Sequence, residues 1–117
     1  MRRLDDHTVY HFRGCGYCSR VRRALRDLEL ETNWADVNLD PADRARLRQA
    51  TGYATVPVLR IDDEDGRQRW MPESADIVRY LYREYGNGRR PPLSVWITPA
   101  HVVLAIALLL LLLSQLL

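Results

Sequence analysis

The amino-acid sequence predicts an α/β domain whose elements follow the order strand, helix, strand, helix, strand, strand, helix (βαβαββα), with one further helix at the C-terminus. Three observations support this fold class. Short β-prone runs alternate with segments of helical periodicity over residues 8–85. Turn-forming residues separate these segments. Residues 95–117 contain no Asp, Glu, Lys or Arg and are mostly aliphatic, so they are expected to form a different structural unit.

The first half of the domain is predicted to consist of two strand–helix units. Residues 8–12 form an apolar, β-prone run, and residues 17–30 carry apolar side chains at the i, i+3, i+4, i+7 spacing of an amphipathic helix. The core residues expected from this helix are Val21, Ala24, Leu25 and Leu28. Residues 33–37 predict a short second strand. A second helix over residues 41–50 should follow, with the Asp40–Pro41 pair as N-cap and first helical residue.

The second half of the domain is predicted to be a hairpin followed by a closing helix. Residues 56–61 are expected to form the third strand, and residues 67–71 return as the fourth. Residues 62–66 supply the turn between them. The closing helix is expected over residues 73–85, and the Gly-Asn-Gly sequence at residues 86–88 should end it.

Both cysteines of the chain lie where the first strand should turn into the first helix. The segment Gly14–Ser19 reads Gly-Cys-Gly-Tyr-Cys-Ser. Unsatisfied N–H groups at a helix N-terminus stabilise a thiolate, so Cys15 is expected to be a nucleophile near neutral pH. Cys18 lies one turn further along the same side and can attack a mixed disulfide formed on Cys15. The pattern predicts thiol–disulfide chemistry with both cysteines as catalytic residues.

Two alternatives for the cysteines are weaker. A structural zinc site needs four ligands, and besides this pair the chain offers only the scattered His7, His11 and His101. A structural disulfide is the other alternative, but a disulfide that closes so short a loop would restrict the unfolded chain little and would therefore add little stability. No metal site is therefore predicted.

Composition limits the cellular context. The chain has 117 residues, and its 17 basic side chains are all arginine; the net charge of +2 does not call for a nucleic-acid partner. The N-terminus lacks the apolar run of a secretory signal, so the thiols are expected to stay reduced in the cytosol.

The C-terminal segment is predicted to be a membrane anchor. Residues 102–113 are an unbroken aliphatic run without a polar face. With Thr98 as N-cap and Pro99 at the first helical position, the helix would have about 19 residues and a length of roughly 28 Å, close to the thickness of a bilayer core. Arg89 and Arg90 before it place the soluble domain on the cytoplasmic side.

This interpretation divides the chain into three parts. Residues 1–88 are the soluble domain, residues 89–94 are a linker, and residues 95–117 are a single-pass transmembrane helix in contact with the lipid bilayer. The alternative is a helix that dimerises in water or packs on the domain.

Three short motifs carry a resemblance to a known family. They are Cys-Gly-Tyr-Cys at Cys15–Cys18, Thr-Val-Pro at Thr55–Pro57, and Glu-Ser-Ala-Asp-Ile at Glu73–Ile77 with Tyr80–Leu81 after it. Together they resemble the glutaredoxin family and the related N-terminal domain of glutathione S-transferases over residues 9–86. The resemblance implies a thioredoxin-like fold of the glutaredoxin type. It also implies a glutathione-dependent oxidoreductase that reduces disulfides or protein–glutathione mixed disulfides near the membrane.

The resemblance further implies a glutathione site. The Val56–Pro57 bond would be cis and face Cys15, and the Val56 backbone would pair with glutathione as with an extended peptide. Ser74 would hold the α-carboxylate of the γ-glutamyl end, and Glu73 or Asp76 its ammonium group. The alternative is that Glu73 and Ser74 only cap the closing helix.

Side chains around the first helix are expected to complete this site. Tyr17 would line the groove beside Cys15 or cover the core. Positive charge on Arg13 would lower the thiol pKa and attract anionic glutathione. The arginines further along the helix are expected to form a solvated outer face, namely Arg22, Arg23 and Arg26.

Two departures from the family pattern leave other functions open. Many glutaredoxins have lysine where this chain has Phe12, and many dithiol members have proline where it has Gly16. Members with glycine there include some that bridge a homodimer through a [2Fe-2S] cluster, which Cys15 from two subunits and two glutathiones would ligate here. A cluster carrier is one alternative function, and a non-enzymatic, transferase-like adaptor is another.

Overall fold

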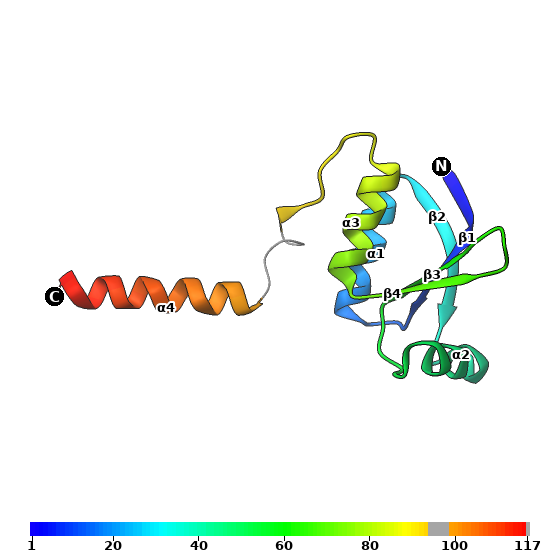
Figure 1. The fold of residues 1–117 in the computed structure, drawn as a ribbon, viewed down its shortest axis with the longest axis horizontal. Coiled ribbons are helices and arrows are strands. Elements are labelled where there is room, and N and C mark those ends of the chain that lie inside the picture. Colours follow the sequence, from blue (N-terminus) through cyan, green and yellow to red (C-terminus); the bar gives the residue numbers. More distant parts are fainter. Residues whose placement is uncertain (94–98, 117) are drawn as a thin grey trace.

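The computed structural model describes residues 1–93 and 99–116, which form the elements predicted and in the predicted order (Figure 1). The elements are β1 (Arg2–His11), α1 (Gly16–Asp27), β2 (Leu30–Asp36), α2 (Pro41–Thr51), β3 (Val58–Asp62), β4 (Gln68–Pro72), α3 (Ser74–Tyr85) and α4 (Pro99–Leu116). The four strands form one sheet in the order β2-β1-β3-β4. β1 and β2 are parallel, whereas β3 is antiparallel to both β1 and β4.

Helices cover both faces of the sheet. Val9 and Leu59 pack in one buried cluster with side chains of α1 and α3. Their sequence neighbours Tyr10 and Val58 point to the opposite face, where they pack with Leu47 of α2. Figure 1 shows α1 and α3 together on one side of the sheet and α2 apart from them. Alternation along the strands thus builds a core on each face.

The first strand is longer than the sequence predicts. It begins at Arg2 rather than at residue 8, and the register with β2 shifts between Leu4 and Thr8. Charged residues fill this stretch, so the apolar signal that marks the rest of the strand is missing there. α1 ends earlier than predicted, at Asp27, because Glu29 has a φ of 55° and turns the chain into β2.

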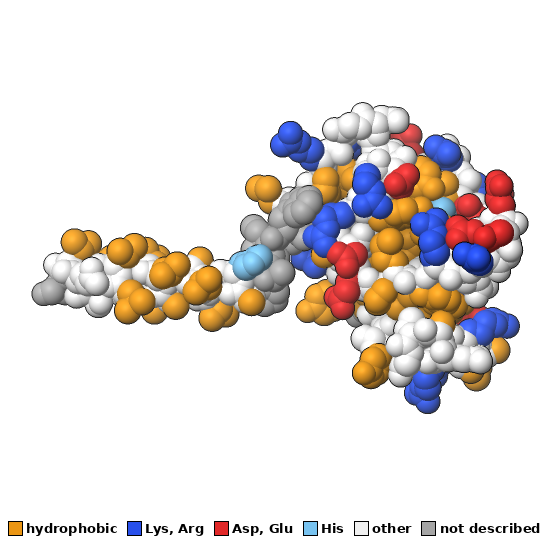
Figure 2. All heavy atoms as spheres, viewed as in Figure 1, with side chains coloured by type: hydrophobic (Ala, Val, Ile, Leu, Met, Phe, Trp, Pro, Cys, Tyr) orange, Lys and Arg blue, Asp and Glu red, His pale blue; other side chains and the backbone are white. Residues whose placement is uncertain are grey.

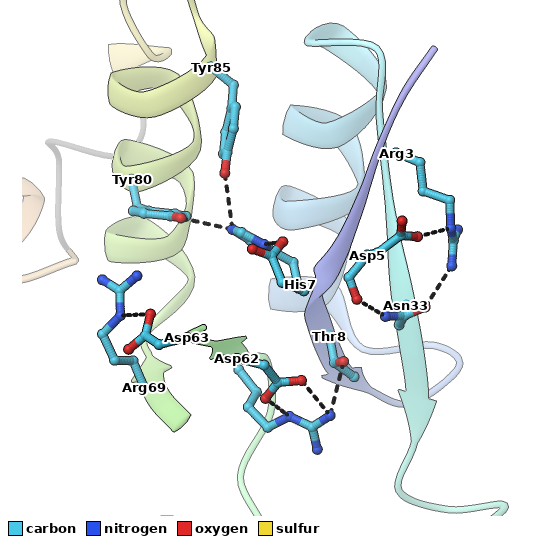
Figure 3. A network of polar contacts seen from close by, with 12 residues as sticks. Arg3, Asp5, His7, Thr8, Asn33, Asp62, Asp63, Arg69, Tyr80 and Tyr85 are labelled. Carbon is cyan, nitrogen blue, oxygen red and sulfur yellow. Dashed lines mark hydrogen bonds and ion pairs between the residues drawn. The ribbon is translucent and has the colours of Figure 1, made fainter. Parts of the chain in front are cut away.

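A buried histidine joins β1 to α3 (Figure 3). His7 is 2% exposed, and its Nε2 lies 2.8 Å from the hydroxyl of Tyr80 and 3.3 Å from that of Tyr85. Its Nδ1 lies 2.7 Å from a carboxylate oxygen of Asp6. Both ring nitrogens therefore have partners, as a buried polar side chain requires.

The C-terminal helix corrects the prediction for the tail. α4 has 18 residues, close to the 19 that the sequence predicts. Among the residues that the structure describes, no helix has the length and apolarity needed to cross a membrane. The predicted transmembrane helix over residues 95–117 is therefore not supported. Residues 94–98, with the predicted N-cap Thr98 and the end of the predicted linker, lie outside the described residues.

Candidate active site

Cys15 occupies the position that the sequence predicts, at the N-terminus of α1. It is the N-cap residue, with extended backbone angles, and its Sγ accepts a hydrogen bond from the backbone N–H of Cys18 at 3.2 Å. The side chain is 8% exposed, so the sulfur lies just below the surface. The sulfur of Cys15 therefore receives an N–H at the positive end of a helix.

Cys18 has a different environment although it lies only one turn away. It is completely buried among apolar side chains and forms no disulfide with Cys15. Burial, with a further contribution from the hydrogen bond to Cys15, raises the pKa of the Cys18 thiol to about 12. At neutral pH Cys18 is therefore a thiol, and the two sulfurs cannot play the same role.

Strand pairing brings the other two motifs to the same edge of the sheet as the cysteines. Val58 pairs with Tyr10 on β1 and with Pro72 on β4. The residues just before Val58 therefore lie between the end of β1, which leads to Cys15, and the start of α3. Val56 packs in the same buried cluster as Cys15 and Cys18, and the Val56–Pro57 bond is cis, as predicted.

The start of α3 differs from an ordinary capped helix. Glu73 takes the N-cap position, but its side chain makes no capping hydrogen bond and its φ is 76°. Such a left-handed conformation is unfavourable for a residue with a side chain and is found most often at functional sites. Ser74 follows as the first helical residue and is buried, at 7% exposed. Glu73 is therefore the N-cap residue by position, as the alternative predicted, but its side chain does not cap the helix.

Arg20 connects the two halves of the site, which the sequence analysis did not predict. Its guanidinium lies 3.5 Å from the hydroxyl of Ser74 and 6.0 Å from the centre of the Tyr17 ring. Tyr17 is exposed, at 63%, so it does not cover the core. The only signal in the sequence was that Arg20 lies three residues after Tyr17, on the same side of the helix.

Two predicted site residues lie further out. Asp76 is exposed and forms an ion pair with Arg79 on the same helix, which competes with any role toward an ammonium group. Arg13 is exposed in the turn that leads to Cys15. The structure therefore groups Cys15, Cys18 and Val56, and separately Tyr17 and Ser74 through Arg20.

Arg22 is not on a solvated outer face, contrary to the prediction. Its guanidinium donates to Nδ1 of His11 at 2.8 Å and approaches the carbonyl oxygen of Phe12 at 3.4 Å. It also lies over the ring of Trp34 at 5.8 Å. Because the Phe12 carbonyl accepts from the N–H of Cys15 at 3.3 Å, Arg22 supports the turn that holds the nucleophile.

Metal coordination receives no support from the geometry. Within residues 1–93 and 99–116, no group of three or more His, Cys, Asp or Glu side chains is placed to hold a metal ion.

Comparison with known proteins identifies relatives of residues 9–90. This segment matches the family described as "Glutathione S-transferase, N-terminal domain". The class-mu 28 kDa glutathione S-transferase isozymes of Schistosoma haematobium and Schistosoma bovis are each 26% identical over 81 residues, which cover 69% of this chain and 37% of each relative. The chain therefore spans little more than a third of the length of these proteins.

Solved structures show the same fold. A trimeric glutathione transferase of Leishmania superposes with a TM-score of 0.58 and 26% identity, over 69% of this chain and 18% of that one. A maleylacetoacetate isomerase from Anaeromyxobacter dehalogenans, solved with glutathione in its active site, gives a TM-score of 0.54 at 24% identity, over 74% of this chain and 42% of that one.

Proposed function

The chain belongs to the glutathione S-transferase N-terminal domain family, with its α/β thioredoxin-like fold, and we propose that it is a glutathione-dependent thiol–disulfide oxidoreductase. The observation that carries the proposal is that the two cysteine side chains have different environments. Cys15 sits at a helix N-terminus with an N–H donated to its sulfur, whereas Cys18 is buried with its pKa raised to about 12. Cys15 is thus placed to act as the nucleophile, whereas Cys18 is a buried, protonated thiol.

The proposed reaction proceeds in two exchanges. The Cys15 thiolate attacks the glutathione sulfur of a glutathionylated protein, so a Cys15–glutathione disulfide forms and the protein thiolate leaves and takes up a proton. A second glutathione thiolate then attacks the glutathione sulfur of this intermediate, which releases oxidised glutathione and restores the Cys15 thiolate. Glutathione is the reductant. Because Cys18 is protonated at neutral pH, this route through free glutathione is favoured over attack by Cys18.

The proposed glutathione site runs from Val56 to the start of α3. The Val56 and Pro57 backbone would pair with the cysteinyl part of glutathione, next to Cys15. Ser74 and Arg20 would bind the α-carboxylate, because an arginine and a hydroxyl at a helix N-terminus form a favourable anion site. Glu73 would take the ammonium group, and Tyr17 would flank the bound peptide. Arg13 and Asp76 would contribute only long-range charge.

A second candidate is glutathione transfer to an electrophile, because the Schistosoma and Leishmania relatives named above are transferases. The chain covers little more than a third of the curated ones, so the activity of the whole relatives remains a proposal here. The non-enzymatic adaptor and the [2Fe-2S] carrier are the remaining alternatives. The pair of cysteines in unequal environments favours the oxidoreductase over all three.

We further propose that α4 attaches the domain to the cytoplasmic face of a membrane. Its side chains are exposed from residue 100 to residue 116, and they include no Asp, Glu, Lys or Arg. Exposed leucines in such number are unfavourable in water, and lipid is the solvent that suits them. Glutathionylated or disulfide-containing proteins near that surface would be the substrates.

The oxidoreductase proposal is tested on the full chain in detergent. The visible spectrum is recorded first, because absorbance by a purified cluster would favour the carrier. Formation of oxidised glutathione from a glutathione–peptide mixed disulfide is then followed for the wild type, Cys15→Ser and the matched control Cys18→Ser. We expect turnover to vanish in Cys15→Ser and to persist in Cys18→Ser. Equal turnover in the wild type and Cys15→Ser would refute the proposal, and conjugation of an aryl halide with no disulfide reduction would favour the transferase.

A further inference from the structure

A basic groove lies on α3, away from the cysteines. It has a volume of about 470 Å³, and the described residues that line it include four arginines, Arg79, Arg83, Arg89 and Arg90, with Asp76 as the acidic member. The rest of the lining is mostly apolar. The proposed oxidoreductase chemistry makes no use of this groove.

Three of the four arginines form ion pairs, and Arg79 pairs with Asp76 inside the groove itself. Arg83 pairs with Glu84 at 3.2 Å with both side chains well exposed, and Arg89 pairs with Asp27 at 2.8 Å, also at the surface. Exposed ion pairs contribute little free energy, so these guanidinium groups can turn to a better anion at small cost. Arg83 also lies over the Tyr80 ring at 5.7 Å, which holds it at the groove. The groove therefore offers several charges to one anionic group.

The kind of ligand that the groove binds is indicated by α4, the helix that follows the groove in the chain. Pro91 lines the groove and α4 begins at Pro99, eight positions later, so at most about 28 Å of chain separates them. Figure 2 shows hydrophobic side chains along α4, with no Lys, Arg, Asp or Glu on the visible face and a histidine near the start of the helix. The apolar run is consecutive and thus surrounds the helix. A single protein partner would cover one side only, whereas lipid would cover all sides.

We propose that the groove binds the phosphate headgroup of an anionic phospholipid in the membrane that α4 contacts. The inference rests on the membrane attachment proposed above. A guanidinium matches a phosphate through paired N–H donors, and basic side chains next to an apolar anchor are attracted by anionic headgroups. The acyl chains would continue toward the same apolar phase as α4.

The test is competitive partitioning of the full chain between two kinds of vesicle. One kind is phosphatidylcholine alone, and the other is phosphatidylcholine mixed with phosphatidylglycerol; the bound fractions are measured by flotation. Arg83→Gln/Arg90→Gln removes two charges from the groove. The control Arg44→Gln/Arg48→Gln removes two from a groove on α2 that also has arginines but lies far along the chain from α4. We expect the wild type and the control to prefer anionic vesicles. In the groove variant, the ratio of binding to anionic over neutral vesicles should fall roughly fivefold for each arginine replaced.

The outcomes separate the groove from the anchor. Binding to both vesicles without preference, or equal loss of preference in the two variants, would overturn the headgroup site while leaving the attachment through α4 intact. No binding to either vesicle would overturn the attachment and the headgroup site together, and disulfide turnover would still test the oxidoreductase separately. Inorganic phosphate at constant ionic strength distinguishes the ligand source. If the preference for anionic vesicles persists in millimolar phosphate, the lipid site is supported. If the preference disappears in millimolar phosphate, the lipid site is overturned in favour of a site for free phosphate.

Discussion

The backbone N–H of Cys18 donates to the sulfur of Cys15 at 3.2 Å, so one cysteine supplies the hydrogen bond that holds the sulfur of the other. The donor's own thiol is buried, and its pKa is raised to about 12. At pH 8 the Cys18 side chain should therefore remain a protonated thiol. The two cysteines should therefore differ in reactivity by far more than their exposure suggests.

Alkylation tests this difference directly. We expect iodoacetamide at pH 8 to label one cysteine per folded chain, and peptide mapping to assign the label to Cys15. Cys18 should react only when the chain is unfolded in urea. The Cys15→Ser variant is the control and should remain unlabelled in the folded state. Rapid labelling of Cys18 in that variant would contradict the assignment.

Substitutions at Arg20 and Ser74 should affect glutathione binding more than the chemical step. The guanidinium of Arg20 lies 3.5 Å from the Ser74 hydroxyl, where both would contact the same carboxylate. We expect Arg20→Gln to raise KM for glutathione roughly tenfold, because a charge-assisted hydrogen bond contributes about 1.5–3 kcal/mol, and to leave kcat within about twofold. Arg23→Gln is the matched control on an exposed position of α1. A decrease in kcat at unchanged KM would remove Arg20 from the binding site.

The contact between Arg22 and His11 should appear in the titration of the histidine. Burial first, and then the charge of Arg22, lower the pKa of His11, while Asp36 opposes them. In Arg22→Gln we expect an NMR titration to place this pKa higher than in the wild type but still below its ordinary value of about 6.5, because burial remains. Arg26→Gln serves as the control, since Arg26 is exposed on the last turn of α1. The same pKa in the wild type and Arg22→Gln would show that the contact is absent in solution.

The sequence predicted the fold well because its signals are local. Apolar periodicity marked α1 and α3, and an Asp-Pro pair marked the start of α2. The start of β1 was missed because this part of the strand is held by pairing with β2, which is a long-range contact. Its mostly charged residues do not show the alternation of apolar and polar side chains that predicts a strand. The predicted membrane span over residues 95–117 is not supported, because no helix among the described residues has the length and apolarity needed to cross a membrane.

Within the candidate site, the residues in motifs were easier to predict than their partners. Cys15 and the cis Val56–Pro57 bond lie where the motifs place them. The roles of Arg20 and Arg22 depend on which way long side chains turn, and several arginines on one helix look alike in the sequence. The positive φ of Glu73 arises from the join between β4 and α3, which no local pattern revealed.

The buried His7 cluster should contribute measurably to stability. Nε2 of His7 lies 2.8 Å from the Tyr80 hydroxyl but 3.3 Å from that of Tyr85. Replacement of His7 by Leu would leave the buried Tyr80 hydroxyl without this partner and should cost about 1–3 kcal/mol, measured by urea denaturation. Tyr80→Phe should cost more than Tyr85→Phe. A double-mutant cycle between His7→Leu and Tyr80→Phe should give a coupling energy, and strictly additive losses would contradict the hydrogen bond.

The pairing of Tyr82 with Asp27 should make stability depend on acid pH. The Tyr82 hydroxyl donates to the Asp27 carboxylate, and this bond, followed by that from Arg89, holds the pKa of Asp27 below its ordinary value. A depressed carboxyl pKa stabilises the fold above the unfolded value of about 3.9, and this stabilisation is lost as the pH falls through the folded value. Tyr82→Phe should therefore be less stable than the wild type at pH 5, and the difference should shrink toward pH 2 as the Asp27 carboxylate becomes protonated. Tyr85→Phe is the control, because it removes a hydroxyl from the same helix that lies against His7 rather than against Asp27. Urea denaturation at the two pH values measures both differences, and an equal loss for Tyr82→Phe at pH 5 and pH 2 would show that the hydroxyl does not act through the Asp27 charge.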